Sequence, residues 1–433
     1  MPGADNGVSR RAGRVPSSKR SVPISPPVPP TDPSLLREWD ALHSLRADDG
    51  ILREIADRGV LSELALQQQL RKRFPDDLVR VALVVAEMRA KAAAKFSRAA
   101  LMWFDRIGFE QSTGEEVARH KAKRFAGTVL DLCCGIGGDA VALAEVAQRV
   151  VAVDQNPLAC LRTAWNAEVH GVGDRIEPRV GGAEEAWAEF GAGVTGAGAD
   201  RPLVHVDPDR RAGTNSRAVR IEDYAPGLEF MERLFREARG GAVKLSPAAN
   251  FTGRFPGTEI EIVSLAGEAK EATVWFGELA GETPYRATVL PSGETIAGHP
   301  LDFSAERLTA PGGWLFDPDP AVVRAGLVDS VAERLGLARL DDEEEYLSGP
   351  EGPVNSHFVR SFRVLADLPN NDRHIRDWFR THPVRQVEIK CRHVPIRADE
   401  VRRKLPLEGE GAAVLFFAKV AGRTRAIVAE RAG

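Results

Sequence analysis

A glycine-rich turn flanked by acidic residues carries the chemistry that stands out in this chain. The stretch TVLDLCCGIGGD, residues 128–139, reads as an apolar strand, a turn through Gly135 and Gly137, and a helix over 140–148. Glycines let the backbone turn sharply and let a ligand approach closely, and the N–H groups at a helix start favour an anionic group. A second apolar run, VVAVD, ends in Asp154, where an acid would hold the hydroxyls of a ribose. These features predict a site for a nucleoside cofactor.

Two cofactors fit this turn. Residues 135–140, GIGGDA, satisfy G-x-G-x-x-A, which is one form of the dinucleotide fingerprint. The alternative is S-adenosylmethionine, whose carboxylate and ammonium take the place of the pyrophosphate. Asp131 favours this alternative, because an acid at the strand end would repel a pyrophosphate but could pair with an ammonium, directly or through water.

The turn must be positioned by a parallel sheet. Residues 127–290 alternate between predicted strands and helices, which is typical of a parallel sheet with helices on both faces. After Asp154 we expect a helix over 157–170, strands RIEPRV, LVHVD and GAVKLS, and helices AEEAWAEF and GLEFMERLFREA. Two late strands, TEIEIVSL and EATVWFGEL, are joined by a connection too short for a helical crossover, so they must pair antiparallel. A late antiparallel hairpin is unlike the ordinary dinucleotide domain.

Different patterns flank this region. Residues 1–33 are rich in Pro, Ser, Gly and Arg, with five basic against two acidic residues, so we expect a disordered basic tail. Residues 34–125 repeat apolar positions at a spacing of three to four, which predicts a helical region. From residue 372 onward we expect helix HIRDWFRT, strand RQVEIKC, helix ADEVRRKL and strands AAVLFFAKV and RTRAIVAE. Between about 295 and 370 only AVVRAGLVDSVAERLG predicts a helix.

The overall composition narrows the class of protein. A chain of 433 residues with 43% hydrophobic content is long enough for two or three domains. A net charge of −4 does not indicate a nucleic-acid binder, but the segment from 372 carries +6, fourteen Lys and Arg less eight Asp and Glu. Four cysteines without metal-like spacing predict a reducing cytoplasm and no metal site. No apolar run is long enough to cross a bilayer, so we expect no membrane partner.

Together these residues resemble class I S-adenosylmethionine-dependent methyltransferases. The matching stretches are VLDLCCGIGGDA, VVAVDQNP, WNAEVHGV and VDPDRR. The core is most similar to the trimethylguanosine-synthase type, in which D-x-x-C-G-x-G-G follows a short segment such as EQSTGEE. The stretch VEIKCRHVPIRADEVRRKL resembles a THUMP-like domain. The resemblance implies a Rossmann-like α/β methyltransferase domain over 126–290 with its late antiparallel hairpin, after a basic tail (1–33) and a helical N-terminal region (34–125). A small α/β THUMP-like region would follow over 300–433.

The resemblance also implies which residues hold the cofactor. The glycine turn and Asp131 would bind the amino-acid end, Asp154 the ribose, and the two residues after it the adenine side. Ser112 and Thr113 would close over the methionine moiety, although the same residues, followed by two glutamates, also resemble a helix N-cap. The implied cofactor-binding residues are Ser112, Thr113, Asp131, Cys133, Gly135, Gly137, Asp154, Gln155 and Asn156.

The catalytic residues implied by the resemblance follow the fourth strand. Asp207 and Pro208 would lie beside the transferable methyl group, where they could orient an amine or hydroxyl and accept its proton. Related amino-group methyltransferases usually carry an aromatic residue next, to stack a flat base. Here Asp209, Arg210 and Arg211 follow instead. The two arginines could bind a phosphate or carboxylate of the substrate, or could pair with Asp209 or Glu222 to fix the loop.

We therefore predict an S-adenosylmethionine-dependent methyltransferase that acts on RNA, without a distinction between tRNA and rRNA. The prediction of RNA as the substrate rests on the THUMP-like resemblance and on the basic C-terminal segment. One alternative is a non-catalytic RNA-binding protein with a vestigial S-adenosylmethionine pocket, which the unusual DPDRR motif suggests. The other is a NAD-dependent oxidoreductase, which Asp131 and the late hairpin disfavour.

Overall fold

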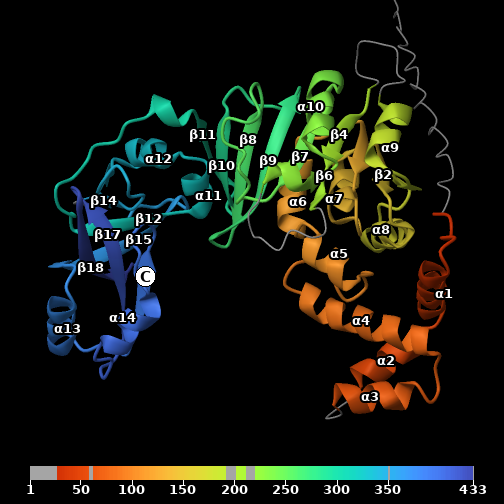
Figure 1. The fold of residues 1–433 in the computed structure, drawn as a ribbon, viewed down its shortest axis with the longest axis horizontal. Coiled ribbons are helices and arrows are strands. Elements are labelled where there is room, and N and C mark those ends of the chain that lie inside the picture. The colour runs from red at the N-terminus through yellow and green to blue at the C-terminus, as the bar shows by residue number, and fades with distance from the viewer. Residues whose placement is uncertain (1–26, 58–61, 192–200, 211–219, 350–351, 433) are drawn as a thin grey trace, which may run out of the picture.

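The computed structural model describes residues 27–57, 62–191, 201–210, 220–349 and 352–432. Figure 1 shows an elongated molecule, with a large sheet between a group of N-terminal helices and a C-terminal sheet. Most of the predicted basic tail, residues 1–26, lies outside the described residues, and the first helix begins at Pro33. No helix in the described ranges combines the length and the apolar character needed to span a membrane.

The N-terminal region is helical, as predicted. Its apolar residues pack around Trp39, Leu42 and Val79. This core also contains Leu158 and Trp165, so the region packs against helix α8 (Pro157–His170). Figure 1 shows α1 to α4 gathered at this end of the molecule. The helices are α1 (Pro33–Ala47), α2 (Gly50–Ala56), α3 (Glu63–Leu70), α4 (Asp76–Ala92), α5 (Arg106–Gln111) and α6 (Glu115–Ala122).

A nine-stranded sheet forms the centre of the molecule. Its order is β11-β10-β8-β9-β7-β4-β1-β2-β3, in which the strands from β7 to β3 are parallel. Strand β9 runs antiparallel to both β7 and β8, so the predicted antiparallel hairpin is confirmed. The strands are β1 (Thr128–Leu132), β2 (Arg149–Asp154), β3 (Ile176–Val180), β4 (Leu203–Val206), β7 (Gly240–Leu245), β8 (Glu259–Leu265), β9 (Glu268–Gly277), β10 (Tyr285–Leu290) and β11 (Glu294–Gly298).

Apolar side chains cover both faces of this sheet. Two buried clusters contain Leu130 and Val204 on one side and Val129 and Val150 on the other, as expected for parallel strands covered by helices. The covering helices are α7 (Gly138–Val146), α8 (Pro157–His170), α9 (Ala183–Phe190) and α10 (Leu228–Glu237). Strands β10 and β11 were not expected, and they carry the sheet past residue 290, where we had placed the end of this domain.

A second sheet of seven strands, in the order β13-β14-β12-β15-β18-β17-β16, builds the C-terminal part. The helices and strands predicted from residue 372 onward are confirmed. The single helix predicted within 321–336 is wrong, because Gly326 adopts φ +73° and separates two short helices. The elements are β12 (Trp314–Pro318), α11 (Pro320–Arg324), α12 (Val328–Leu335), β13 (Ala338–Arg339), β14 (Leu347–Gly349), β15 (Val359–Pro369), α13 (Asp372–Thr381), β16 (Gln386–Cys391), α14 (Ala398–Lys404), β17 (Ala412–Val420) and β18 (Arg423–Arg431).

Candidate cofactor and catalytic site

The carboxyl ends of the parallel strands border a cavity of about 1120 Å³. Ligands of open α/β sheets bind at this edge, and pockets for small molecules commonly measure roughly 300–1,000 Å³. This cavity can therefore hold a cofactor together with part of a substrate. The predicted site residues that line it are Ser112, Thr113, Asp131, Cys133, Gly135, Asp154, Asp207 and Pro208.

The glycine turn connects β1 to α7 and faces the cavity with Gly135. The Gly135 N–H donates to Asp154 Oδ2 at 2.9 Å, which ties the turn to the end of β2. Gly137 does not line the cavity, contrary to the expectation. Its N–H donates to the Cys134 carbonyl at 3.0 Å, and a Cβ at its φ of +88° would lie 3.0 Å from Thr163 Cγ2 on α8. Gly137 therefore serves the close packing of the turn on α8.

Gly138 was expected to shape the turn and to let a ligand approach, but it was not among the residues assigned to cofactor binding. It lines the cavity at the first residue of α7. A Cβ on Gly138 would lie 3.1 Å from the Thr113 carbonyl oxygen and 3.3 Å from Ser112 Cβ. The absence of a side chain at Gly138 thus lets the segment that contains Ser112 and Thr113 approach the glycine turn. The run of two glycines in GIGG was the available signal.

Asp131 lies in β1 and is paired with a residue that we did not predict. Its Oδ1 lies 2.6 Å from His205 Nδ1 on the neighbouring strand β4, and both side chains are fully buried. Burial raises the pKa of the Asp131 carboxyl, and His205 opposes this shift. Asp131 Oδ2 has no hydrogen-bond partner among the described residues, and both side chains border the cavity. One carboxylate oxygen therefore remains for a ligand.

Asp154 ends β2 with both oxygens in use by the backbone, since Oδ1 accepts the Asn156 N–H at 2.8 Å. Each oxygen of a carboxylate can accept a further hydrogen bond, so Asp154 can still receive ribose hydroxyls. The placement of Gln155 and Asn156 beside adenine is not supported, because both are exposed and neither lines the cavity. Asn156 instead caps α8: its Oδ1 accepts the Leu158 N–H at 2.9 Å, immediately before the Pro157 that starts the helix.

Ser112 and Thr113 lie in the loop between α5 and α6. Thr113 Oγ1 donates to Asp139 Oδ2 at 2.6 Å in a buried contact with the first turn of α7. Ser112 Oγ donates to the Phe109 carbonyl at 3.0 Å and accepts from Lys95 Nζ at 3.2 Å. Neither residue is the N-cap of α6, which is Gly114, so that alternative interpretation is wrong. Both residues line the cavity, as the resemblance implied.

Cys133 follows β1 and is half-buried, with φ +62°. Burial and the surrounding carboxylates of Asp154, Asp207 and Asp131 raise the pKa of its thiol well above the usual range. A thiol that stays protonated is a poor nucleophile. Cys133 therefore lines the cavity as a neutral side chain.

Asp207 and Pro208 directly follow β4 and line the same cavity. Lys244 Nζ, from β7, lies 2.6 Å from Asp207 Oδ2, and the Asp207 N–H donates to the Leu132 carbonyl at 3.1 Å. Burial raises the pKa of the Asp207 carboxyl, and the charge of Lys244 opposes that shift. Burial also acts against the charge of Lys244, but Asp207 and Asp139 outweigh it and raise the pKa of that ammonium. Lys244 therefore stays positively charged and holds the carboxylate of Asp207 in place.

The two predicted substrate residues cannot be placed. Arg211 and the side chain of Arg210 lie outside the described residues, while the backbone of Arg210 pairs with Tyr224 in a short ladder of β5 (Asp209–Arg210) and β6 (Tyr224–Ala225). Glu222, one of the acids considered as their partner, pairs with Arg254 at 3.0 Å. The roles of Arg210 and Arg211 stay predictions.

The charges around the cavity distinguish between the two cofactors. Asp131, Asp139, Asp154 and Asp207 all line it, and Asp131 presents a buried oxygen without a described partner. Asp139 and Asp207 are paired with Lys121 and Lys244, so the free oxygen of Asp131 is the group that favours a ligand ammonium and would repel a pyrophosphate. The residues present therefore fit S-adenosylmethionine and do not fit a dinucleotide.

Comparisons with known proteins agree with this assignment. The family model described as RNA cap guanine-N2 methyltransferase matches residues 126–205, and the model described as THUMP domain-like matches residues 359–431. The chain is 36% identical over 306 residues to an uncharacterised S-adenosylmethionine-dependent methyltransferase of Mycobacterium tuberculosis strain CDC 1551 / Oshkosh, covering 69% of this chain and 80% of the relative. The counterpart in strain H37Rv gives the same values.

One solved structure shares the fold of most of the chain. It is the crystal structure of a methyltransferase-like protein from Porphyromonas gingivalis W83, with a TM-score of 0.72 and 20% identity. The match covers 88% of this chain and 98% of that chain. The arrangement of a helical N-terminal region, a Rossmann-like sheet and a C-terminal sheet therefore occurs in both proteins.

Proposed function

The chain belongs to the S-adenosylmethionine-dependent methyltransferases, and we propose that it methylates RNA. The family identifies S-adenosylmethionine as the cofactor. RNA is supported by the match of residues 126–205 to an RNA cap guanine-N2 methyltransferase model and of 359–431 to a THUMP-like model. The excess of positive charge from residue 372 onward suits a phosphate backbone. Neither the oxidoreductase nor the non-catalytic alternative gains support from the comparisons.

The observation that carries the proposal is that Asp207 and the glycine turn line one cavity. S-adenosylmethionine supplies a methyl group on a sulfonium leaving group. Three residues would hold this cofactor. Asp131 would offer its free carboxylate oxygen, and Gly135 would let the cofactor approach the backbone closely. Asp154 would bind the ribose. Asp207 would orient the amine or hydroxyl of the substrate and accept its proton, while Lys244 fixes the carboxylate.

The finer points belong to the same proposal. Arg210 and Arg211 would contact a phosphate of the RNA near Asp207. The division into a helical region (34–125), a methyltransferase domain (126–290, extended by β11) and a THUMP-like region (300–433) follows the two sheets. A cytoplasmic location accords with the four free cysteines, which a reducing compartment keeps as thiols. The choice between tRNA and rRNA stays open to experiment.

Calorimetric titration with S-adenosylmethionine, and separately with NAD, tests the cofactor. We expect S-adenosylmethionine to bind with a dissociation constant on the order of micromolar and the Asp154→Ala variant to lose most of that affinity. Transfer of a labelled methyl group to total RNA, but not to a protein pool, then tests the substrate. Labelling of protein alone would overturn RNA as the substrate, and absence of binding would overturn the assignment of the cavity.

A further inference from the structure

A buried lysine of helix α6 connects residues that line the cavity with strand β9 of the nine-stranded sheet. Lys121 is 2% exposed, and its Nζ lies 2.9 Å from Asp139 Oδ1 and 2.8 Å from Glu271 Oε1. Asp139 in turn accepts the hydroxyl of Thr113 at 2.6 Å. Asp139, Glu271 and Thr113 all line the cavity, whereas Lys121 does not. A continuous chain of charged and polar contacts thus joins β9 to the loop that borders the cofactor.

We propose that Lys121 is a positioning residue for cofactor binding, which acts by holding the Asp139 carboxylate that fixes Thr113 at the cavity. The inference rests on the assignment of this cavity to S-adenosylmethionine. It assigns a role to a residue that touches neither cofactor nor substrate.

The electrostatics keep this chain of contacts ionic. Burial disfavours the charge of Lys121, but Asp139 and Glu271 outweigh it and raise the pKa of the ammonium. Burial likewise acts against the Asp139 carboxylate, but Lys121, together with His205, Lys244 and the Thr113 hydroxyl, outweighs it and lowers the pKa of that group. Asp139 therefore remains an acceptor for the Thr113 hydroxyl across the physiological pH range, and the hydrogen bond is charge-assisted.

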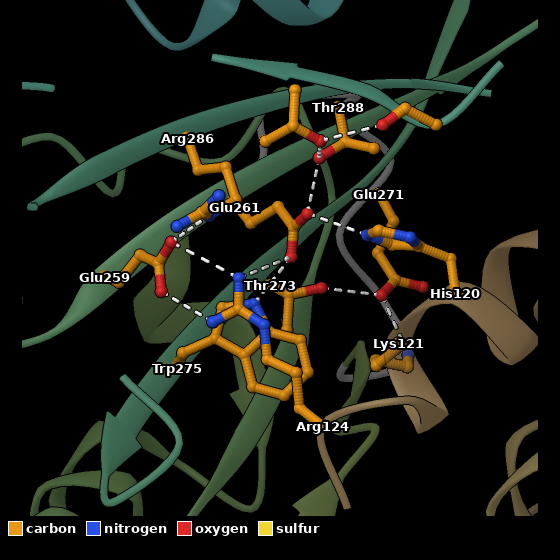
Figure 2. A network of polar contacts seen from close by, with 12 residues as sticks. His120, Lys121, Arg124, Glu259, Glu261, Glu271, Thr273, Trp275, Arg286 and Thr288 are labelled. Atoms are coloured by element: carbon orange, nitrogen blue, oxygen red, sulfur yellow. Dashed lines mark hydrogen bonds and ion pairs between the residues drawn. The ribbon is translucent and has the colours of Figure 1, made fainter. Parts of the chain in front are cut away.

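Other polar contacts of α6 and of the turn after it are close by but do not reach Asp139. Figure 2 shows His120 and Lys121 of α6, and Arg124 just after the end of this helix, beside the glutamates of β8 and β9. His120 Nε2 lies 2.8 Å from Glu261 Oε1, and Arg124 Nη1 donates to Glu259 Oε2 at 2.6 Å. Among the described residues, Lys121 is the one of these three that pairs with Asp139. Arg124 therefore provides a control from the turn directly after the same helix and in the same network.

The position of Thr113 matters because the loop is packed tightly against the glycine turn. The Thr113 carbonyl would lie only 3.1 Å from a Cβ on Gly138. A loop so close to the turn cannot shift inward, and the hydrogen bond of Thr113 to Asp139 keeps it at the turn. Buried ion pairs often give no more stability than apolar groups of similar size, so stability alone does not explain the Lys121 contacts.

The test compares single and double variants by calorimetric titration with S-adenosylmethionine and by chemical denaturation. We expect Thr113→Val to raise the dissociation constant roughly tenfold, because it removes the hydroxyl that joins the loop to Asp139. Lys121→Met should weaken binding to a similar extent and add little in the Thr113→Val background, because both act through one contact. Arg124→Met should lower stability but change the dissociation constant by less than about twofold.

Two results would overturn the inference. One is Lys121→Met with wild-type affinity, and the other is a Lys121→Met effect that adds in full to that of Thr113→Val. Where Lys121→Met does not fold, Asp139→Asn interrupts the same chain of contacts and takes its place in the comparison. Wild-type protein that fails to bind S-adenosylmethionine would contradict the cofactor assignment itself, so the two failures are distinguishable.

Discussion

The carboxylate of Asp131 and the imidazole of His205 lie 2.6 Å apart between β1 and β4, and both are fully buried. The glycine turn begins shortly after Asp131, and Asp207 follows His205 by two positions. The pair therefore joins the strand that leads to the glycine turn with the strand that leads to Asp207. It also leaves Asp131 Oδ2 at the cavity without a described partner.

His205→Leu should destabilise the protein strongly, because it leaves Asp131 buried without its partner. Removing one member of a buried pair typically costs about 3–5 kcal/mol in the free energy of unfolding. Urea denaturation measures the loss, and the double variant Asp131→Leu/His205→Leu should recover most of it. The double variant should nevertheless bind S-adenosylmethionine weakly. Wild-type stability in His205→Leu would mean that the contact between His205 and Asp131 does not stabilise the fold.

Gly138→Ala should weaken cofactor binding without a matching loss of stability. Its Cβ would meet the Thr113 carbonyl at 3.1 Å and push the loop from its place, while alanine is favourable at a helical position. Gly127→Ala provides the opposite case, since Gly127 has φ +70° and open space around a Cβ. That variant should lose about 1–2 kcal/mol of stability and keep its cofactor affinity. Equal effects of the two variants on binding would contradict this account.

Most of the sheet could be predicted because buried parallel strands appear as continuous apolar runs. The limits of α8 were also visible, since Pro157 fits a first helical turn and Gly171 adopts the left-handed conformation at its end. Asp154 and Asp207 were found because each directly follows such a run. The strands of the C-terminal sheet before residue 370 were missed, because β12 pairs with β14 and β15 across long loops, and no short hairpin turn connects it to either partner.

The buried charges could not be predicted from the sequence. Glu259 and Glu261 alternate with apolar residues in β8, which is the pattern of a strand with one solvated face, yet both are buried under α6. Lys121 lies in the run RHKAKRF, where nothing distinguishes it from an exposed lysine. The pairing of His205 with Asp131 depends on the register between β1 and β4, which a sequence does not specify.

The free energy of unfolding should fall at acidic pH, because the carboxylate of Glu261 becomes protonated. Burial acts against its charge, but His120, Arg124 and Thr288 outweigh burial and lower the pKa of this carboxyl to about 2. A carboxyl whose pKa is lower in the folded than in the unfolded protein stabilises the fold above the unfolded value. That stabilisation is lost as the pH falls from about 4.5 toward 2.

Glu261→Gln should therefore be less stable than the wild type at pH 7, by about 3 kcal/mol, and the difference should shrink as the pH approaches 3. Urea denaturation at a series of pH values measures it. Glu268→Gln is the matched control, because Glu268 is exposed on the adjacent strand and should show almost no difference at pH 7. A constant deficit in Glu261→Gln at every pH would show that lost packing, and not lost charge, causes the effect.

Lys244→Met should shift the pH dependence of methyl transfer and leave cofactor affinity intact. Burial raises the pKa of Asp207, and the ammonium of Lys244 at 2.6 Å opposes this shift. Without that ammonium the pKa of Asp207 rises further. Because the carboxylate form orients the substrate and accepts its proton, activity is present above the pKa of Asp207 and lost as the pH falls through it. The acid limb of the kcat/KM profile should therefore move to higher pH in Lys244→Met.

The same measurement separates this effect from a general loss of positive charge. Lys270 also lines the cavity, but its ammonium pairs with Glu268 and makes no hydrogen bond to Asp207. Lys270→Met should therefore keep the wild-type acid limb, whereas Asp207→Asn should lower kcat by roughly 10²–10⁴-fold and remove the limb. If Lys244→Met and Lys270→Met moved the limb equally, the field of the whole cavity would set the pKa of Asp207. A shift confined to Lys244→Met would assign that control to the direct contact.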